Sequence, residues 1–249
     1  LYEITPEHKI KACEETGDVD FGHEIPGLAR YRANFFMQKN GVGAVFREIP
    51  STILTAEQLG LPPVASKLAM LPRGMVLVTG PTGSGKSTTL ASIIDVANRN
   101  RKDHIITIED PIEFVHQSQS CIINQREVGL HTKTFSSALR GALREDPDII
   151  LVGEMRDLET ISLAVEAATT GHLVFSTLHT TGATKTVDRV IEVFPAQEQA
   201  QIRSTLADGL RAVISQTLFK RVDKPGRIVA LEILIATPGV RNLIREGKS

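Results

Sequence analysis

A phosphate-binding loop is the most specific chemical feature of the sequence. The apolar run 75–79 leads into GPTGSGKST, which matches the pattern G-x-x-x-x-G-K-[ST]. Glycines let such a loop point successive backbone N–H groups at phosphate oxygens, and the helix that follows adds its positive N-terminal end. We expect Lys86 to reach the β- and γ-phosphates of a nucleotide and Ser87 to ligate Mg²⁺. The predicted nucleotide-binding residues are Gly80, Pro81, Thr82, Gly83, Ser84, Gly85, Lys86, Ser87 and Thr88.

A carboxylate, Glu154, follows the apolar run 149–152. Hydrolysis of a nucleoside triphosphate needs a group that orients a water molecule in line with the γ-phosphate, and we predict this role for Glu154. The alternative is a solvated loop charge or a helix cap. Gly153 stands where many proteins with this loop place an aspartate that organises Mg²⁺, so we expect that task to fall to Ser87 and to carboxylates acting through water.

Three more acids, Glu109, Asp110 and Glu113, follow the apolar run 104–108. Because ligands bind beyond the carboxyl ends of parallel strands, these acids are expected at the same edge of the sheet as the phosphate-binding loop. Asp110 is predicted to hold Mg²⁺ through water, and Glu113 is a second candidate for that role. A solvated loop charge is the alternative for Asp110.

Two histidines, His172 and His179, flank the apolar run 173–178. They cannot share one metal ion, because the strand separates them by roughly 23 Å and their odd spacing puts them on opposite faces. His179, at the carboxyl end, is placed to sense the γ-phosphate or to polarise Glu154. His172 is expected to be structural or to lie at a subunit contact.

Three arginines lie in predicted N-terminal strands. Arg30 and Arg32 share one face of the strand 28–38, and Arg47 lies on the neighbouring strand 42–49. Guanidinium groups bind phosphate in a bidentate geometry and stabilise charge that develops in phosphoryl transfer. An isolated arginine pair is otherwise typical of a solvated sheet face. The residues alone leave both interpretations open.

The overall composition is that of an ordinary globular protein. The 249 residues include 28 Lys and Arg against 29 Asp and Glu, a formal charge of −1, and 41% are hydrophobic. This composition excludes extensive disorder, and the length suffices to bury a core without disulfides or a structural metal. Because the charge is nearly neutral, no nucleic-acid partner is expected.

Cysteine content and hydropathy restrict the remaining classes. Cys13 and Cys121 are too few and too far apart for a four-cysteine zinc site or a disulfide framework, and they fit a reducing cytosol. No apolar run approaches the roughly 18 residues needed to span a bilayer, so a membrane connection is expected only through a partner. The chain begins at Leu1 rather than Met and stops at Ser249 just after a predicted helix, so we expect the natural protein to be longer at both ends.

Two regions of different pattern position these side chains. Residues 1–50 are predicted to form a small α+β domain, with a helix that ends at Gly17 and a hairpin of strands 28–38 and 42–49. The proline-punctuated stretch 51–63 is predicted to be a linker.

Residues 64–249 are predicted to form an α/β domain with a mainly parallel sheet. Apolar strand-like runs alternate with helical patterns, which is typical of a parallel sheet covered on both faces. The predicted strands are 75–79, 104–108, 149–152 and 173–178, and the predicted helices are 86–99, 135–145, 157–169 and 183–193. A helix at about 196–219, a strand at 227–235 and a last helix after Pro238 complete the domain.

Four boxes in this order resemble those of the type II/IV secretion motor ATPases. They are the Walker A box GPTGSGKST (80–88), the Asp box IITIEDPIEF (105–114), the Walker B box DIILVGEMRD (148–157) and the His box TTGHLVFSTLHTTGA (169–183). The similarity covers nearly the whole chain and is greatest to the PilT-like type IV pilus retraction ATPases.

Two features favour retraction motors within this superfamily. The extension and type II secretion motors typically insert a four-cysteine zinc module, which Cys13 and Cys121 cannot supply. The segment GVRNLIREGK (239–248) resembles the AIRNLIRE helix of retraction motors and departs from it at the first two residues.

The resemblance implies a RecA-like P-loop ATPase domain preceded by a PAS-like N-terminal domain, and a homo-hexamer that uses ATP and Mg²⁺. It also implies which side chains are catalytic: Glu154 and Glu113 carry hydrolysis, His179 and His172 form the His-box pair, and Arg30 and Arg32 act on the nucleotide from the N-terminal domain.

The function that the resemblance implies is retraction and disassembly of a type IV pilus, which produces twitching motility. The expected partner is a PilC-like platform protein of the inner membrane, with the motor itself in the cytoplasm and peripheral to that membrane. Two alternatives remain open: a related secretion, extension or translocation motor, and a nucleotide-gated accessory paralogue with little hydrolysis. DNA-stimulated turnover would favour a DNA translocase, and absence of phosphate release would favour the accessory protein.

Overall fold

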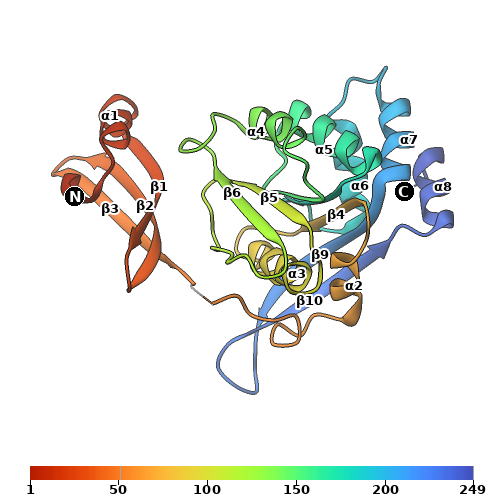
Figure 1. The fold of residues 1–249 in the computed structure, drawn as a ribbon, viewed down its shortest axis with the longest axis horizontal. Coiled ribbons are helices and arrows are strands. Elements are labelled where there is room, and N and C mark those ends of the chain that lie inside the picture. The colour runs from red at the N-terminus through yellow and green to blue at the C-terminus, as the bar shows by residue number, and fades with distance from the viewer. Residues whose placement is uncertain (51, 249) are drawn as a thin grey trace.

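The computed structural model describes residues 1–50 and 52–248, which contain two β-sheets (Figure 1). Ser51, the first residue of the predicted linker, and Ser249, the last residue of the predicted α/β domain, lie outside the described residues.

The N-terminal sheet is antiparallel and carries one helix. After a 3-10 turn, η1 (Tyr2–Ile4), the elements are α1 (Glu7–Thr16), β1 (Asp18–Ile25), β2 (Ala29–Gln38) and β3 (Gly41–Ile49), with strand order β1-β2-β3. Gly17 ends α1 in the left-handed region at φ 89°, which suits a residue without a Cβ. Phe21, Ala33 and Phe35 are buried with Cys13 and Val19 in a small core beside α1. The predicted hairpin is confirmed, and β1 is an additional strand.

The second sheet has seven strands in the order β10-β9-β4-β8-β7-β5-β6. Its strands are β4 (Gly74–Thr79), β5 (His104–Glu109), β6 (Ile122–Glu127), β7 (Ile149–Val152), β8 (Leu173–Leu178), β9 (Leu210–Lys220) and β10 (Arg227–Ile235). All neighbouring pairs are parallel except β9 with β10. The predicted fold class, an α/β fold with a mainly parallel sheet, is therefore confirmed.

Helices cover both faces of this sheet, as Figure 1 shows. One apolar core joins the sheet to α2 (Pro63–Ala69) and α3 (Lys86–Asn100). The other joins it to α4 (Phe135–Ala142), α5 (Leu158–Thr170), α6 (Ala183–Glu192), α7 (Gln199–Gly209) and α8 (Pro238–Glu246). The central strands β4, β7 and β8 are buried throughout, because both of their faces meet helices.

One predicted element is wrong. The helix expected over about 196–219 ends at Gly209 as α7, and the rest of that segment is strand β9. Strand β9 lies between β4 and β10, and its residues 212–216 are buried. A strand that is buried on both faces has no alternating pattern, so periodicity does not distinguish it from a buried helix. Strand β6, at the sheet edge, was not predicted because its residues are largely polar.

The described residues bear on cysteine pairing, metal ligation and membrane-spanning helices. Cys13 and Cys121 are free, buried thiols. Within residues 1–50 and 52–248, no cluster of three or more His, Cys, Asp or Glu side chains is arranged to hold a metal ion by itself. In the same part of the chain, no helix has both the length and the apolar character needed to cross a bilayer.

Candidate active site

Four neighbouring parallel strands bring the predicted functional loops to one edge of the sheet. Strands β4, β8, β7 and β5 are adjacent, so the segments after their carboxyl ends meet there. A cavity of about 400 Å³ opens at this edge. Its lining includes the loop residues Thr82, Gly83, Gly85, Lys86, Ser87 and Thr88 and the predicted site residues Asp110, Glu113, Glu154, His179 and Arg32. Gly80, Pro81 and Ser84 lie outside the lining.

The phosphate-binding loop adopts a conformation that depends on glycine. Gly80, Gly83 and Gly85 have φ values of 140°, 78° and 87°. A Cβ on Gly80 would lie 2.2 Å from the backbone oxygen of Gln216 on β9, so both the backbone angle and the space require glycine there. No side chain caps the N-terminus of α3, so the N–H groups of its first turn can donate to a ligand. The loop and helix are therefore arranged as an anion site.

Lys86 is held by the loop's own carbonyls. Its Nζ donates to the oxygens of Gly80 at 2.9 Å and Pro81 at 3.2 Å, and the residue is buried. Burial lowers the pKa of Lys86 below its ordinary value, although the charges of Glu154 and Glu113 act in the opposite direction. A phosphate group in the cavity offers this ammonium a stronger, charge-assisted partner.

Glu154 lies between two basic side chains. Its Oε2 is 2.6 Å from an Nη of Arg156, and its Oε1 is 2.9 Å from Nε2 of His179. Burial raises the pKa of Glu154, but the hydrogen bond and charge of Arg156 and the charges of His179 and Lys86 outweigh burial and lower it overall. The carboxylate is thus ionised at neutral pH and oriented by its neighbours, as a general base requires.

The acids after β5 lie in different environments. Asp110 and Glu113 line the cavity, and Asp110 is exposed. Glu109 also lines it, but its Oε1 accepts hydrogen bonds from Thr107 Oγ1 at 2.7 Å and from Gln125 Nε2 at 3.2 Å. Burial raises the pKa of Glu109 to about 6, against the effect of these hydrogen bonds. Hydrogen bonds thus tie Glu109 to β5 and β6, and the two other acids line the same cavity as Gly83 and Gly85.

The space for a side chain at residue 153 is tight. A Cβ at Gly153 would lie 3.2 Å from the backbone oxygen of Ile108 and 3.3 Å from Cα of Glu109. Thr177 on β8 donates to the oxygen of Gly153 at 2.6 Å, which fixes this peptide between strands β5 and β8. A larger residue such as aspartate would require these backbone atoms to shift by a few tenths of an ångström.

The two arginines on β2 face different partners. Arg32 lines the cavity with Arg47 and donates to Asp20 at 3.0 Å. That hydrogen bond raises the pKa of Arg32, and Asp110 and Glu113 act in the same direction from across the cavity. Arg30 is not in the cavity lining. It forms an ion pair with Glu127 at 2.9 Å.

The two histidines lie at opposite ends of β8, as the strand length predicts. His179 reaches Glu154, whereas Nδ1 of His172 lies 3.1 Å from the oxygen of Ala167 in α5. The structure thus brings His179 but not His172 to the cavity. A structural or subunit-contact role for His172 stays a prediction.

Sequence reasoning missed two residues at this edge. Arg156 follows Glu154 by two positions within the Walker B box, so its spacing was a usable signal. Nε2 of Gln216 donates to the backbone oxygen of Ser84 at 2.6 Å, although the two residues are 132 positions apart in the sequence. The sequence gave no signal for this contact, because of that separation and because the segment around Gln216 resembled a helix. Gln216 braces the phosphate-binding loop from β9.

A second, more apolar cavity adjoins the loop on the side of α3. Its volume is about 260 Å³, and Gly85 and Thr88 are shared with the first cavity. Its apolar wall is contributed by the linker and by β9 and β10, through Leu54, Leu59, Leu61, Leu218 and Val229. An apolar cavity beside an anion site is suited to a planar base attached to phosphates.

Comparison with known proteins identifies relatives over the whole chain. Residues 41–245 match the family model of the type II/IV secretion system protein. The type IV pilus retractation ATPase PilT of Pseudomonas aeruginosa is 60% identical over 248 residues, which cover 100% of this chain and 72% of that protein. A twitching motility protein of Neisseria gonorrhoeae is 60% identical over 245 residues, 98% of this chain and 66% of that protein. The crystal structure of the pilus retraction motor PilT with bound ADP has a TM-score of 0.95 and 50% identity, and the match covers 99% of this chain and 72% of that one.

Proposed function

The chain belongs to the type II/IV secretion system protein family, and we propose that it is an ATP-hydrolysing motor that powers type IV pilus retraction. The observation that carries the proposal is the single cavity in which the phosphate-binding loop faces Glu154, Glu113 and Asp110. The high identity to proteins named for pilus retraction and twitching motility, and the likeness to a structure that contains ADP, support ATP and pilus retraction over other nucleotides and tasks.

In this proposal, the loop binds the triphosphate and Glu154 prepares the attacking water. The N–H groups of the loop and the N-terminus of α3 surround the phosphates, and Lys86 leaves the carbonyls of Gly80 and Pro81 for the β- and γ-oxygens. Glu154 accepts a hydrogen bond from water and orients it toward the γ-phosphorus. Arg156 and His179 hold the carboxylate in place.

The remaining cavity residues balance the charge of the reacting group. The donors near the loop fit Mg²⁺, because the Ser87 hydroxyl and the carboxylate of Asp110 acting through water are the hard oxygen ligands that this ion uses beside phosphate. When bound, Mg²⁺ would neutralise charge on the β- and γ-phosphates. Glu113 is proposed to assist hydrolysis, and Arg32 to stabilise charge from the N-terminal sheet.

The base of the nucleotide is proposed to occupy the apolar cavity on the other side of Gly85. Leu61 and Leu218 would contact its faces, and Thr88 lies between the two cavities. Binding in both cavities would connect the linker after the N-terminal sheet to the occupancy of the phosphate site.

The assembly is proposed to be a homo-hexamer in the cytoplasm, attached to the inner membrane through a PilC-like platform protein. The relatives named as a type IV pilus retractation ATPase and as a twitching motility protein support this context. No nucleic-acid partner is proposed, because the formal charge of the chain is −1.

Two measurements test the proposal. In the presence of Mg²⁺, the full chain should release phosphate from ATP at a measurable steady-state rate that DNA does not change. If no phosphate is released, an accessory role would be supported instead. Cells whose copy carries Lys86→Ala should then accumulate pili. Cells without pili would indicate an extension motor. If the variant no longer binds nucleotide but the number of pili is unchanged, a pilus function would be contradicted.

A further inference from the structure

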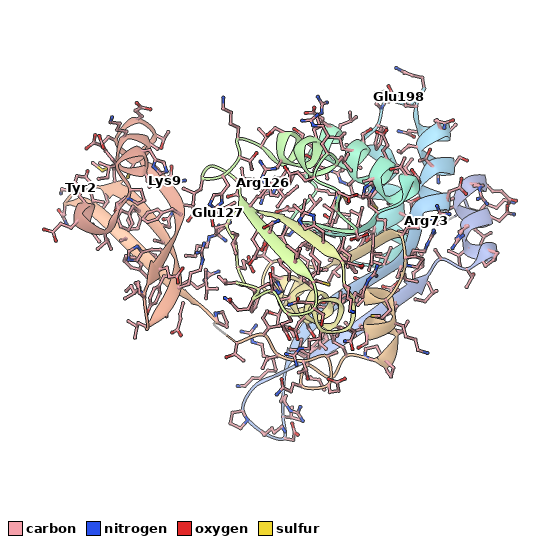
Figure 2. The ribbon with its side chains drawn as sticks, in the orientation of Figure 1. Tyr2, Lys9, Arg73, Arg126, Glu127 and Glu198 are labelled. Carbon is pink, nitrogen blue, oxygen red and sulfur yellow. The ribbon has the colours of Figure 1, made fainter. Side chains whose placement is uncertain are left out.

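The N-terminal sheet contacts the larger sheet near the end of β6. Figure 2 labels Glu127 at this end, and it labels Lys9 on α1, which lies across from it. The Nζ of Lys9 lies 3.5 Å from where a Cβ of Gly129 would be, so α1 approaches the turn after β6. The ion pair between Arg30 and Glu127 joins β2 to β6 in the same region.

A single oxygen of Glu127 accepts hydrogen bonds from both the N-terminal sheet and the loop after β5. Oε2 accepts a hydrogen bond from an Nη of Arg30 at 2.9 Å and another from the backbone N–H of Ile112 at 3.2 Å. The side chain of Glu127 is 4% exposed and that of Arg30 is 19% exposed. Another Nη of Arg30 lies 3.7 Å from Oε2 of Glu24, a largely exposed carboxylate. Glu127 is the more deeply buried of the two carboxylates and therefore depends on Arg30 for charge compensation.

Ile112 immediately precedes Glu113, which lines the phosphate cavity. Carboxylates hold the backbone of this loop, since Glu127 accepts from Ile112 and Oε2 of Glu109 accepts from the N–H of Glu113 at 3.4 Å. On the other side of Glu113, the backbone oxygen of Phe114 accepts from Nε2 of Gln125 at 2.8 Å. A displacement of the Glu127 carboxylate therefore changes one of the hydrogen bonds that hold the backbone around Glu113.

Gly22 on β1 leaves the space through which Arg30 reaches Glu127. A Cβ at Gly22 would lie 2.5 Å from an Nη of Arg30 and 3.4 Å from Oε2 of Glu127. The neighbour in conflict is the end of a flexible side chain, so the strand can accept alanine, but the guanidinium would have to move away from Glu127. A substitution at Gly22 thus perturbs the pairing of Arg30 with Glu127 and keeps both charged side chains.

We propose that Glu127 is a positioning residue that couples the seating of the N-terminal sheet, through Arg30, to the placement of Glu113 for hydrolysis. The inference rests on the proposed ATPase function. It gives Arg30 a role through Glu127 and the Ile112 backbone, in place of direct contact with the nucleotide.

The test compares four full-length proteins with the wild type: Arg30→Met, Glu127→Gln, the double variant and Gly22→Ala. Arg30→Met should lower kcat by about tenfold or more, since small misplacements of a reacting group have effects of this size, and should change the Kd for ATP by less than about twofold. Gly22→Ala keeps both charged residues and should lower kcat in the same way. Glu127→Gln in the Arg30→Met background should restore most of the lost kcat, because glutamine still accepts from Ile112 without leaving an unpaired buried charge.

Different results would overturn the inference. If Arg30 contacts the nucleotide directly, the double variant will be as slow as Arg30→Met, and Gly22→Ala will not reproduce the loss. Unchanged kcat in Arg30→Met or in Gly22→Ala would also overturn it. If Arg30→Met does not fold, Gly22→Ala alone decides the outcome.

Two controls separate this inference from the proposed function and from general destabilisation. Arg140→Met removes an exposed arginine that pairs with Glu159, and it should leave kcat and Kd unchanged. Absence of turnover in the wild type would contradict the proposed ATPase itself, whereas turnover that is insensitive to all the variants would contradict only the coupling through Glu127.

Discussion

Replacement of Glu109 by glutamine should make the protein more stable at neutral pH. Glu109 lies at the end of β5, where burial raises its pKa from 4.5 to about 6. Glutamine keeps the size of the side chain, and its oxygen can still accept from Thr107 and Gln125. The substitution removes the cost of burying a charge and retains these two hydrogen bonds, and it gives up only the long one that Oε2 accepts from the N–H of Glu113 at 3.4 Å, because an amide nitrogen cannot accept.

The magnitude follows from the difference between the two pKa values. Glu109 holds its proton more tightly in the folded protein than in the unfolded chain. Its contribution to the free energy of unfolding is therefore lost as the pH rises from about 4.5 through 6. Each pKa unit corresponds to about 1.4 kcal/mol, and a difference near 1.5 units therefore gives at most about 2 kcal/mol above pH 7. The open cavity beside Glu109 makes this figure an upper limit, because water there screens part of the charge.

Urea unfolding of the wild type and Glu109→Gln between pH 4.5 and 8 measures this effect. The stability of the variant relative to the wild type should increase across this range by up to about 2 kcal/mol and level off above pH 7. Glu166→Gln, at an exposed position on α5, controls for removal of one negative charge. A difference that does not vary with pH, or that grows as the pH falls, would refute the reasoning.

Three further substitutions test the phosphate site. Lys86→Ala should weaken ATP binding by at least about tenfold, because a charge-assisted hydrogen bond is lost, and titration with a fluorescent ATP analogue checks this. Glu154→Gln should keep nucleotide binding but lower kcat by about 10²–10⁴-fold; normal turnover would remove Glu154 from the mechanism. Gly80→Ala should destabilise the fold by about 2 kcal/mol or more and abolish ATP binding. The reason is that Gly80 has a φ of 140° and that the new Cβ would lie 2.2 Å from the backbone oxygen of Gln216. Thermal unfolding measures the change in stability, and Gly239→Ala, whose Cβ meets no atom within 4 Å, should be neutral in it; equal effects of the two substitutions would contradict the crowding argument.

The local signals in the sequence located strands β4, β5, β7, β8 and β10 and the order of the loops between them, but not β6 or β9. Strands β7 and β8 have the predicted bounds, because each is a short, buried apolar run between turn residues. The position of Glu154 after β7 and of His179 after β8 followed from these bounds and from the rule that ligands bind at the carboxyl ends of parallel strands. Their contact, at 2.9 Å, is consistent with that rule.

The sequence by itself determined that the fold is α/β with a mainly parallel sheet, located most of its strands, and singled out the loop whose pattern is typical of phosphate binding, since periodicity and the GPTGSGKST pattern are local properties. Only the tertiary structure decided the partners of side chains that are distant in sequence. It brought Gln216 to Ser84 and paired Arg30 with Glu127, so that Arg32 lines the cavity and Arg30 does not. The physical reason is that hydrogen bonds and ion pairs depend on distances between atoms, and those distances are fixed by strand order and packing, which no local pattern specifies.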